Sequence, residues 1–369
     1  MKALRVLHVF RILNRGGAET LVMNIYRNID RTKLQFDFLV QHNGIGDYEE
    51  EIKNLGGRIY RIPYITQVGP VIYKRKLLDF FTEKSYSVVH SHLNEMSSII
   101  LGQALKAEVS VRVAHSHTSN AKHSFLEGMV RRYLKSGINS VVTHRFGCSR
   151  EALYWLFGSN TNAEKVIANS VILDNYSIKP QEPVDNHSNG LLIGHVGSFR
   201  KVKNHDFIIE VFKEVLALKP SAELILIGNG PLRSKMERKV EELGISSNVN
   251  FLGIRSDIPE LLSQISLFIM PSLYEGLPLT LIEAQAAGKN CLITDTITNE
   301  ADVGCGLIHR MSLNHPPKEW ANKAVEVYEN KKLVDSHPYI KAAGFDIADT
   351  SQWIEEFYLK EDQQHSILN

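Results

Sequence analysis

Apolar runs alternate with amphipathic stretches along the first half of the chain. The run LRVLHVF at residues 4–10 predicts a buried strand, and residues 18–29, after a glycine-containing turn, have the spacing of an amphipathic helix. Similar units recur in QFDFLV with DYEEEIKNLG, GRIYRIP, YSVVHSH with a helix near 96–106, VSVRVAHSH, and SVVTHRFGCS with REALYWLFG. Short strands alternating with helices predict a mostly parallel sheet wound on both faces.

The pattern stops between residues 178 and 190, where KPQEPVDNHSN is polar, has two prolines and lacks periodicity. It then restarts with LLIGHVGSF, a helix at 204–218, ELILIG, a helix at 231–243, VNFLG, a helix at 257–264, LFIMPS, a helix at 279–287 and NCLIT. We therefore predict an α/β chain of two Rossmann-like domains, at 1–180 and 190–348. The amphipathic segment SQWIEEFYLKEDQQHS within 349–369 either packs locally or crosses back onto the first domain.

The composition is that of an ordinary globular protein, with 369 residues, 43% apolar and 22% charged, and this length favours two domains. No apolar run is long enough to cross a bilayer, and MKALRVLHVF does not have the form of a cleavable signal, so we expect a cytoplasmic protein. The cysteines Cys148, Cys291 and Cys305 are widely spaced and form no C-x-x-C. They favour buried or idle thiols over a disulfide framework or a zinc site.

The formal net charge of +1 conceals two oppositely charged halves. Residues 1–180 hold 24 Lys and Arg against 15 Asp and Glu, whereas residues 181–369 hold 18 against 26. A basic half beside an acidic half indicates an anionic partner or membrane surface bound by one side only. Scattered, solvated surface charge is the alternative.

The loops at the carboxyl ends of the strands are where ligands bind in open parallel sheets. In HVGSFRKVKNHD (195–206), Gly197 ends a strand and Arg200, Lys201 and Lys203 precede a helix. Cations beside free backbone N–H groups at a helix start suit a diphosphate, although a plain basic surface loop would look the same. The turn GNGPLR at 228–233 either contacts a ligand or serves only to turn the chain.

The segment PSLYEGLPLTLIEAQAAG places Glu275 and Glu283 eight residues apart, the second inside a helix that starts near 278–280. The free N–H groups of that helix start suit a phosphate, and the two carboxylates can reach two parts of one ligand. Glu283 lies among apolar residues, where an unpaired carboxylate is costly. A ribose diol bound in bidentate fashion would offset that cost, and an exposed helix face is the alternative.

Two features of the first half also point to a ligand. The turn NRGGAE at 14–19 lies at a strand-to-helix junction, where its glycines let a substrate approach the backbone. His90 and His92 end one predicted strand, and His115 and His117 end another. A single histidine is more often structural, but four at two strand ends indicate either a structural cluster or a site that faces the expected ligand.

In this order, and over nearly the whole chain, the motifs resemble glycosyltransferase family 4, which comprises retaining, metal-independent sugar-nucleotide enzymes of the GT-B fold. The family's E-x7-E pattern is met by Glu275 and Glu283, its Gly-Gly-Ala-Glu by residues 16–19, its Gly-Asp-Gly-Pro turn by 228–231 and its cleft histidine by His117. The resemblance implies two Rossmann-like domains facing across a cleft. The C-terminal domain would bind the donor, the N-terminal domain the acceptor, and the final helix would return to the N-terminal domain.

The resemblance also implies site roles. Glu283 would hold the donor ribose, Glu275 a hydroxyl of the donor sugar and Lys203 the diphosphate, with His117 near the reacting carbon. The catalytic candidates are His117, Arg200, Lys203 and Glu275. The donor-binding candidates are Gly197, Ser198, Arg200, Lys203, Gly228, Ile254, Glu275, Gly276, Leu279, Thr280, Leu281 and Glu283. The acceptor-side candidates are Gly16, Gly17, His92 and His115.

The chain departs from the family pattern at two places. The family usually has Arg directly after the glycine that is Gly197 here, whereas this chain has Ser198, and Arg200 is the candidate to supply the guanidinium instead. The sequence Asn-Ser-Val at 169–171 stands where the family often has Asn-Gly-Val or Asn-Gly-Ile, which we interpret as a local turn variation.

Breaking the bond between a sugar and a nucleoside diphosphate develops negative charge on the leaving group, which Lys203, Arg200 and the helix start would stabilise. No Asp-x-Asp occurs in the chain, so the usual carboxylate ligands for a divalent metal are missing and no metal or other cofactor is expected.

We predict transfer from a nucleotide sugar, with UDP as the first candidate nucleotide. The acceptor would be a glycan or a polyprenyl-diphosphate-linked sugar in exopolysaccharide or capsule synthesis, and no nucleic acid is expected as a partner.

A basic amphipathic stretch within residues 122–135 could rest on an anionic leaflet at the inner face of the plasma membrane, or pack on its own sheet. Its basic and apolar members are Lys122, His123, Phe125, Leu126, Met129, Val130, Arg131, Arg132, Leu134 and Lys135.

Two other functions stay open. One is a nucleotide-sugar epimerase of the same fold, which needs no separate acceptor, and the other is a noncatalytic sugar-nucleotide-binding partner subunit.

Overall fold

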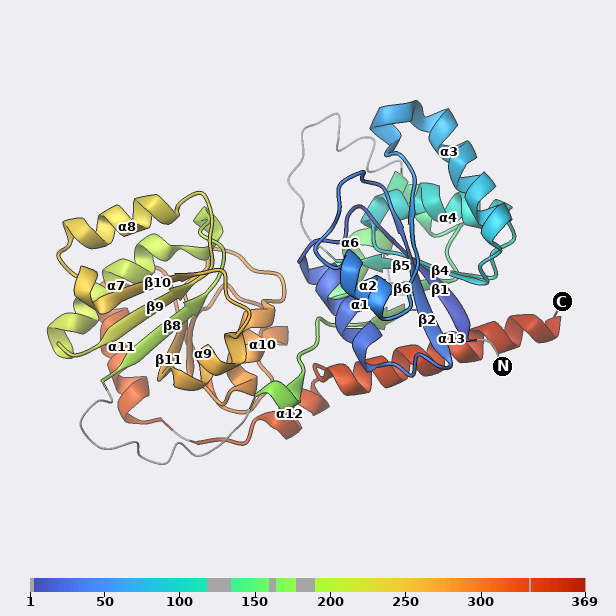
Figure 1. The fold of residues 1–369 in the computed structure, drawn as a ribbon. Coiled ribbons are helices and arrows are strands. Elements are labelled where there is room, and N and C mark those ends of the chain that lie inside the picture. The colour runs from blue at the N-terminus through green and yellow to red at the C-terminus, as the bar shows by residue number, and fades with distance from the viewer. Residues whose placement is uncertain (1–2, 118–133, 159–163, 177–189, 332, 369) are drawn as a thin grey trace. The chain divides into compact units, whose positions relative to one another are not determined.

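The computed structural model of the chain describes residues 3–117, 134–158, 164–176, 190–331 and 333–368 (Figure 1). The chain divides into two compact units. Unit 1 comprises residues 1–170 together with 347–369, and unit 2 comprises residues 171–346. The C-terminal segment therefore belongs to the same unit as the N-terminus.

Unit 1 is built on a parallel sheet with the strand order β3-β2-β1-β4-β5-β6-β7. Its strands are β1 (Leu4–Phe10), β2 (Leu34–Val40), β3 (Ile59–Arg61), β4 (Val88–Ser91), β5 (Val111–Ser116), β6 (His144–Gly147) and β7 (Glu164–Val166). Its helices are α1 (Gly17–Asn28), α2 (Glu49–Asn54), α3 (Ile65–Lys84), the 3-10 turn η1 (Asn94–Met96), α4 (Ser97–Lys106), α6 (Arg150–Phe157) and α13 (Ile347–Leu368).

Unit 2 is built on a second parallel sheet with the strand order β10-β9-β8-β11-β12-β13. Its strands are β8 (Leu192–Val196), β9 (Glu223–Ile227), β10 (Val249–Gly253), β11 (Leu267–Met270), β12 (Cys291–Thr294) and β13 (Ile308–Met311). Its α-helices are α7 (His205–Leu218), α8 (Arg233–Glu242), α9 (Ile258–Gln264), α10 (Leu279–Ala286), α11 (Pro317–Glu329) and α12 (His337–Ala342). Its 3-10 turns are η2 (Leu173–Asn175), η3 (Lys201–Lys203), η4 (Ser246–Asn248) and η5 (Asn299–Ala301).

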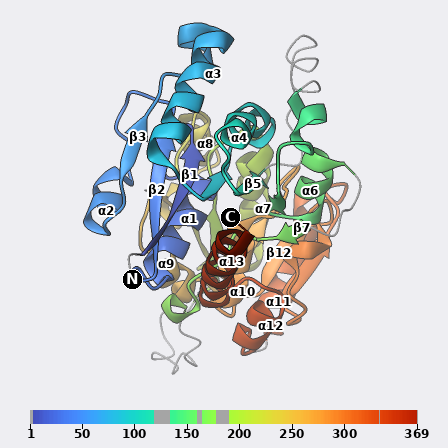
Figure 2. The same ribbon diagram turned by 90° about the vertical axis from the view of Figure 1, so that its right-hand side faces the viewer.

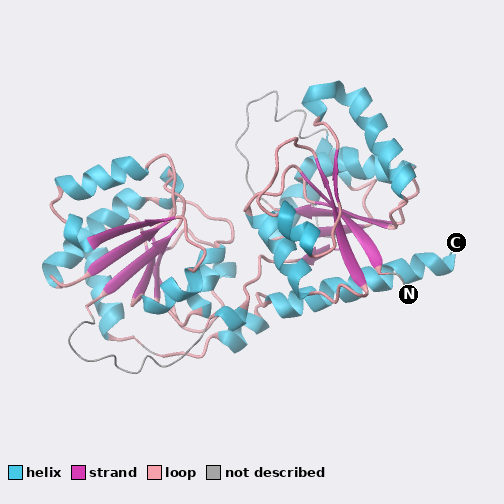
Figure 3. Ribbon diagram, in the orientation of Figure 1, coloured by secondary structure: helices cyan, strands magenta, loops and turns pink. Residues whose placement is uncertain are grey.

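Alternation along β1 sends its side chains to two different layers of unit 1. Leu7 and Val9 join a buried cluster with residues of α3, α4 and α6, such as Leu77 and Leu101. His8, between them, points to the opposite face, which α1 and α13 cover. This is the period of two expected of a strand buried on both faces, and Figure 3 shows helices on both sides of the strands within the unit.

The core of unit 2 lies between its sheet and the helices α7, α8 and α11. Leu224 and Leu226 of β9 and Ile193 of β8 pack there against Phe212 and Trp320. The indole N–H of Trp320 donates to the carbonyl of Ser312 at 3.1 Å, so the largest side chain of the core keeps its polar group satisfied.

Helix α13 packs against α1 in unit 1, and Figure 2 shows it nearly end-on. The carboxylate of Glu355 accepts a hydrogen bond from the backbone N–H of Asp30 at 2.8 Å, and Ser87 donates to Asp362 at 2.5 Å. Tyr358 is fully buried. These contacts attach the last helix to a sheet whose first strand begins more than 340 residues earlier in the sequence.

The prediction of two parallel-sheet α/β domains is confirmed. The sequence pattern did not predict α3, whose apolar spacing is broken where Gly69 (φ 75°) and Pro70 put a kink into the helix. Residues 122–133 of the basic stretch at 122–135 lie outside the described residues. Among the residues that the structure describes, no helix is both long and apolar enough to span a membrane.

Candidate functional site

Three loops at the carboxyl ends of neighbouring strands in unit 2 carry most of the predicted donor residues. Residues 197–204 follow β8, residues 228–232 follow β9 and residues 271–278 follow β11. Because β8 lies between β9 and β11 in the sheet, the three loops meet at one edge. This is the edge where open parallel sheets bind ligands.

The glycine turn after β9 packs directly against the loop after β8. The N–H of Phe199 donates to the carbonyl of Asn229 at 3.1 Å. A Cβ at Gly228, which has a φ of 136°, would lie 2.1 Å from the carbonyl oxygen of Gly197, and one at Gly230 would lie 2.8 Å from the backbone of Phe199. The geometry therefore supports the structural interpretation of this turn, since only glycine permits so close an approach.

The side chains of Lys203 and Glu275 form an ion pair, with Nζ 2.6 Å from Oε1. Both are largely buried, at 16% and 14% exposure. The two loops that carry them are joined by backbone contacts, in which Leu273 N donates to the Val202 carbonyl at 2.8 Å and the Asn204 amide donates to the Pro271 carbonyl at 3.1 Å. The sequence predicted both residues, and the structure brings them together.

Glu283 lies in the second turn of α10 and is partly buried. Burial raises the pKa of its carboxyl group from 4.5 to about 7, although a hydrogen bond from the Tyr176 hydroxyl opposes that shift. Burial and the nearby Glu283 in turn raise the pKa of Tyr176. Tyr176 was not among the predicted residues, because no motif or spacing connects it with a helix more than 100 residues downstream.

The remaining donor candidates lie at the same edge with different exposures. Ser198, Arg200 and Ile254 are exposed, and Gly276, Leu279 and Thr280 are partly buried. The hydroxyl of Thr280 is buried and has no hydrogen-bond partner among the described residues. Leu281 differs from the others because its side chain is in the core and its N–H donates to the Pro278 carbonyl at 3.0 Å.

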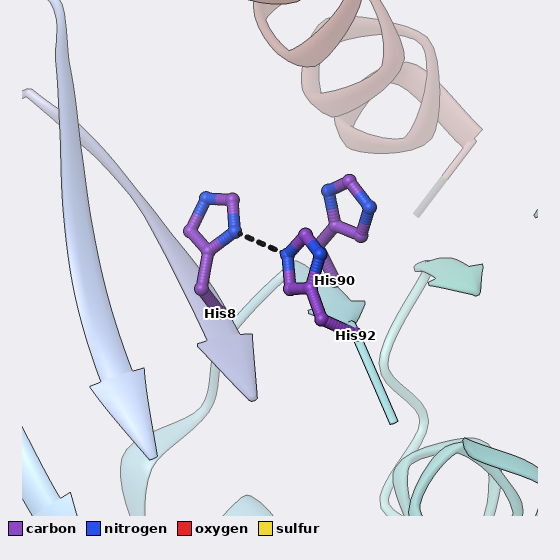
Figure 4. A group of neighbouring side chains, drawn as sticks. All are labelled: His8, His90 and His92. Atoms are coloured by element: carbon purple, nitrogen blue, oxygen red, sulfur yellow. Dashed lines mark hydrogen bonds between the residues drawn. The ribbon is translucent and has the colours of Figure 1, made fainter. Parts of the chain in front are cut away.

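A group of five histidines lies within or directly after β1, β4 and β5 in unit 1. We name it the histidine cluster, and it consists of His8, His90, His92, His115 and His117. Nδ1 of His8 lies 3.0 Å from Nε2 of His92, and Nδ1 of His92 lies 2.9 Å from Nε2 of His117 (Figure 4 shows the first of these contacts). The sequence singled out four of these histidines, and the structure adds His8, which pairs with His90 across β1 and β4.

The histidine cluster is more buried than its position at the strand ends suggested. His8, His90, His92 and His115 are buried, and His117 is half-buried. Burial lowers the pKa of His8 and of His117 to about 3. Burial and the neighbouring imidazoles also lower the pKa of His90, His92 and His115. All five rings are therefore neutral at neutral pH.

The predicted acceptor-side turn lies at the start of α1. Gly16 is the N-cap residue and Gly17 the first residue of the helix. A Cβ at Gly16 would lie 2.4 Å from a carboxylate oxygen of Glu19, whose pKa burial raises. Gly17 is exposed, and a Cβ there would lie 3.4 Å from the Asn169 side chain.

The two edges can do different chemistry. The edge of unit 2 offers a cation, two carboxyl groups and a helix start, a set that suits a polyhydroxylated anion. In unit 1, His8, His90 and His92 form one triplet of potential metal ligands within the described residues, and His92, His115 and His117 form another. Imidazole nitrogens are common ligands of transition metals.

The chain is similar in sequence to known proteins. The glycosyl transferases group 1 family matches residues 179–337. The chain is 39% identical over 332 residues to a Bacillus subtilis (strain 168) protein named "Putative glycosyltransferase EpsF", covering 86% of each chain. It is 26% identical over 375 residues to the capsular polysaccharide biosynthesis glycosyltransferase CapH of Staphylococcus aureus, covering 96% of this chain and 99% of CapH.

A crystal structure of Anabaena HepE in complex with UDP has the same fold, with a TM-score of 0.76 at 18% identity over 97% of this chain and 100% of HepE. The two parallel-sheet units are thus those of the GT-B glycosyltransferases, as the sequence resemblance implied.

Proposed function

This chain belongs to the glycosyl transferases group 1 family and is a glycosyltransferase, and from that premise we propose which transfer it performs. It moves a sugar from a UDP-sugar to a glycan or lipid-linked acceptor in the synthesis of an exopolysaccharide or capsule, with retention of the anomeric configuration. The name of CapH supports the polysaccharide role, and the crystallisation of HepE with UDP and with UDP-glucose supports the donor class.

The observation that carries the donor assignment is the convergence of Lys203, Glu275 and Glu283 at one edge of unit 2. Lys203 and the N–H groups at the start of α10 would bind the diphosphate, because both favour negative charge. Glu283 would accept hydrogen bonds from the ribose hydroxyls. Its raised pKa fits that role, since the site holds a carboxyl group with too few donors to stabilise its charge until a ligand supplies them.

The ion pair of Lys203 with Glu275 gives the site a way to orient the donor. A diphosphate that binds Lys203 would weaken its hold on Glu275, leaving that carboxylate to accept a hydrogen bond from a sugar hydroxyl. Arg200 is exposed in the same loop and would supply the second cation, in place of the arginine that the family usually carries at the Ser198 position.

In the reaction, the bond between the anomeric carbon and the β-phosphate oxygen breaks while the acceptor oxygen bonds to the same carbon from the same face. The acceptor proton passes to the leaving phosphate oxygen, so atoms and charge balance. Lys203 and Arg200 would stabilise the charge that develops on that oxygen, in a preorganised site. His117 would contact the sugar near the reacting carbon.

The proposed reaction needs no divalent metal on the diphosphate, because Lys203 and Arg200 would stabilise the negative charge that a metal would otherwise stabilise. Transfer in a buffer without divalent cations should not increase when Mg²⁺ or Mn²⁺ is added. A several-fold increase with either cation would contradict this part of the proposal.

We propose that α3 is a part of the chain that contacts an anionic membrane surface. Near the kink of this helix Val71 and Ile72 are exposed, at 79% and 48%, and Lys74, Arg75 and Lys76 follow them. Apolar side chains next to cations favour insertion at an anionic leaflet. Flotation with anionic vesicles should recover the protein, and replacement of the three cations by Gln should release it. Full recovery of that variant would contradict this placement.

Transfer is favoured over the two alternatives, epimerisation and a noncatalytic role, because the relatives that span most of the chain are named glycosyltransferases. Incubation with UDP-sugars alone and with a lipid-linked or oligosaccharide acceptor separates all three. We expect a glycosylated acceptor whose anomeric signal in NMR matches the configuration of the donor. An epimerised sugar nucleotide formed without acceptor, or an inverted linkage, would contradict the proposal.

A further inference from the structure

Three members of the histidine cluster lie on the face of the unit 1 sheet that α13 covers. His8 comes from β1, His90 from β4, and His92 directly follows β4 (Figure 4). Each ring can offer one nitrogen such that the three nitrogens lie within 4.8 Å of one another. All three side chains are buried.

Of the three nitrogens that would face an ion, Nε2 of His90 has no hydrogen-bond partner in the described part of the chain, and Nδ1 of His8 and Nε2 of His92 contact only each other there. Nε2 of His90 and Nε2 of His8 are buried and have no hydrogen-bond partner there. Nδ1 of His8 and Nε2 of His92 lie 3.0 Å apart. Two nitrogens that share a tetrahedral ion at about 2.0–2.1 Å from each are about 3.3–3.4 Å apart, so the two rings need to separate by only about 0.3–0.4 Å to bind one.

The other nitrogens of the same rings are held as in metal sites. Nδ1 of His90 shares a hydrogen bond of 2.5 Å with the Tyr358 hydroxyl, and Nδ1 of His92 lies 2.9 Å from Nε2 of His117. A ligating histidine commonly donates its second N–H to such a partner, which fixes the tautomer and aims the lone pair. With the protons on Nδ1, both rings present Nε2 to the ion.

A metal-free arrangement explains only part of this geometry. A neutral chain from His8 through His92 to His117 can share protons along its two contacts, since each neutral ring donates once and accepts once. It leaves Nε2 of His8 and Nε2 of His90 buried without partners, and buried polar atoms are usually satisfied. A bound ion uses the lone pair of Nε2 of His90 and replaces the contact between Nδ1 of His8 and Nε2 of His92, whereas Nε2 of His8 has no partner among the described residues in either arrangement.

We propose that His8, His90 and His92 form a buried site for a borderline divalent transition metal, with Zn²⁺ as the first candidate. The ligand set is three imidazoles and no carboxylate, which suits zinc, cobalt, nickel or copper rather than magnesium or calcium. The ion joins β1 to β4 and, through Tyr358, to α13, so its role is to stabilise unit 1. The donor-binding candidates lie in unit 2, whereas His92 is both a ligand of this proposed site and an acceptor-side candidate, and its Nδ1 contacts His117.

The first experiment measures metal content and melting temperature on the full chain, purified without a histidine tag and without chelators. We expect about one zinc-class ion per chain and a melting temperature that falls after chelation and recovers with Zn²⁺ or Co²⁺. A metal content below about a tenth of an ion per chain, with no thermal shift on adding either ion, would overturn the proposal.

Variants identify the ligands. Tyr358→Phe keeps all three imidazoles and nearly all of the packing, and it should weaken Zn²⁺ binding about 10- to 100-fold in a competition titration. His8→Gln should abolish binding, and the visible spectrum of a Co²⁺-loaded chain should disappear with it. His205→Gln removes a buried imidazole from unit 2 and is the matched control, with unchanged metal content expected.

Two outcomes would count against this ligand set even if the chain binds metal. Retention of the ion by His8→Gln with loss in His115→Gln would assign it to His92, His115 and His117 instead. An equal loss in His205→Gln would show nonspecific binding. If His8→Gln does not fold, Tyr358→Phe decides alone, and unchanged zinc affinity in that variant overturns the assignment.

Discussion

The two units share one architecture, a parallel sheet with helices on both faces, but their carboxyl edges carry opposite chemistry. In unit 2 the edge presents the charged pair of Lys203 and Glu275 on two loops that hydrogen bonds to backbone carbonyls join. In unit 1 the edge carries neutral, buried imidazoles that contact one another and α13. The same fold thus supports a charged edge in one unit and an uncharged, packed edge in the other.

The difference shows that the fold sets where a ligand binds, whereas the side chains set which ligand it is. Unit 1 also has a buried ion pair, but it lies away from the strand ends. Asp37 in β2 accepts hydrogen bonds from Arg5, Tyr86 and the N–H of Arg58. All its partners come from the protein itself, so we expect this pair to stabilise the fold, and the pair of Lys203 with Glu275 to serve a ligand.

Loss of Asp37 should give the largest stability change. Burial would raise its pKa, but the hydrogen bonds from Arg5, Tyr86 and Arg58 bring it below the ordinary value. Asp37→Ala leaves a guanidinium without its partner and should lower the free energy of unfolding by about 3–5 kcal/mol. Urea denaturation measures this. The control is Glu237→Ala, which breaks the exposed pair with Arg233 and should cost less than about 1 kcal/mol.

Because the pKa of Asp37 is lowered in the folded chain, its contribution should be present above pH 4 and lost as the pH falls through its folded pKa. An Asp37→Ala variant as stable as the native chain would remove the contrast between the two ion pairs.

Loss of Lys203 should affect catalysis rather than stability. Lys203→Met removes the cation that would stabilise the leaving diphosphate, and we expect kcat to fall about 10²- to 10³-fold. The matched control is Lys201→Met, an exposed cation two residues away in the same loop, with a change of less than about threefold. Steady-state transfer assays measure both, with melting temperatures to check folding. Equal losses in the two variants would show that only the overall charge of the loop matters.

Glu283→Gln should weaken donor binding and should remove a loss of folding stability that occurs as pH rises. Glu283 keeps its proton to about pH 7 in the folded chain but only to its ordinary pKa of 4.5 when unfolded. Between these values the folded state binds more protons, so the free energy of unfolding falls as pH rises, by about 3 kcal/mol in total. Gln cannot ionise, and the variant should escape this loss. Denaturation at pH 4.5 and pH 8 compares the two proteins.

The same substitution tests the ribose contact. If ribose hydroxyls donate to the ionised carboxylate, UDP-glucose should bind the native chain more tightly as pH rises from 5 to 7, and the Gln variant should bind weakly at both. Titration calorimetry measures this. A Gln variant that matches native affinity at pH 7 would contradict the assignment of Glu283.

Gly228→Ala tests whether the donor edge depends on close backbone contact. Its Cβ would meet the carbonyl oxygen of Gly197, and its φ is unfavourable for other residues, so we expect a loss of about 2–3 kcal/mol and weaker donor binding. Gly244→Ala, with a φ of 68° and open space around its Cβ, is the control and should cost about 1 kcal/mol. Similar losses in both would indicate that only backbone strain matters.

The sequence predicted the two sheets because apolar strands and amphipathic helices have distinct periods, and it predicted Lys203, Glu275 and Glu283 because they occur in short local motifs. It could not predict the partner of Glu283. Tyr176 lies next to the polar stretch between the two halves, and only the folded chain brings it to α10. His8 was missed for a similar reason, since it lies inside an apolar strand and joins the other histidines only through sheet pairing.

The most direct test of the donor edge is a crystal structure of the chain soaked with UDP. We expect the ribose within hydrogen-bond distance of Glu283 and the diphosphate within reach of Lys203 and the start of α10. UDP bound in unit 1, or in unit 2 without contact to Glu283 and Lys203, would contradict the assignment of that edge to the sugar nucleotide.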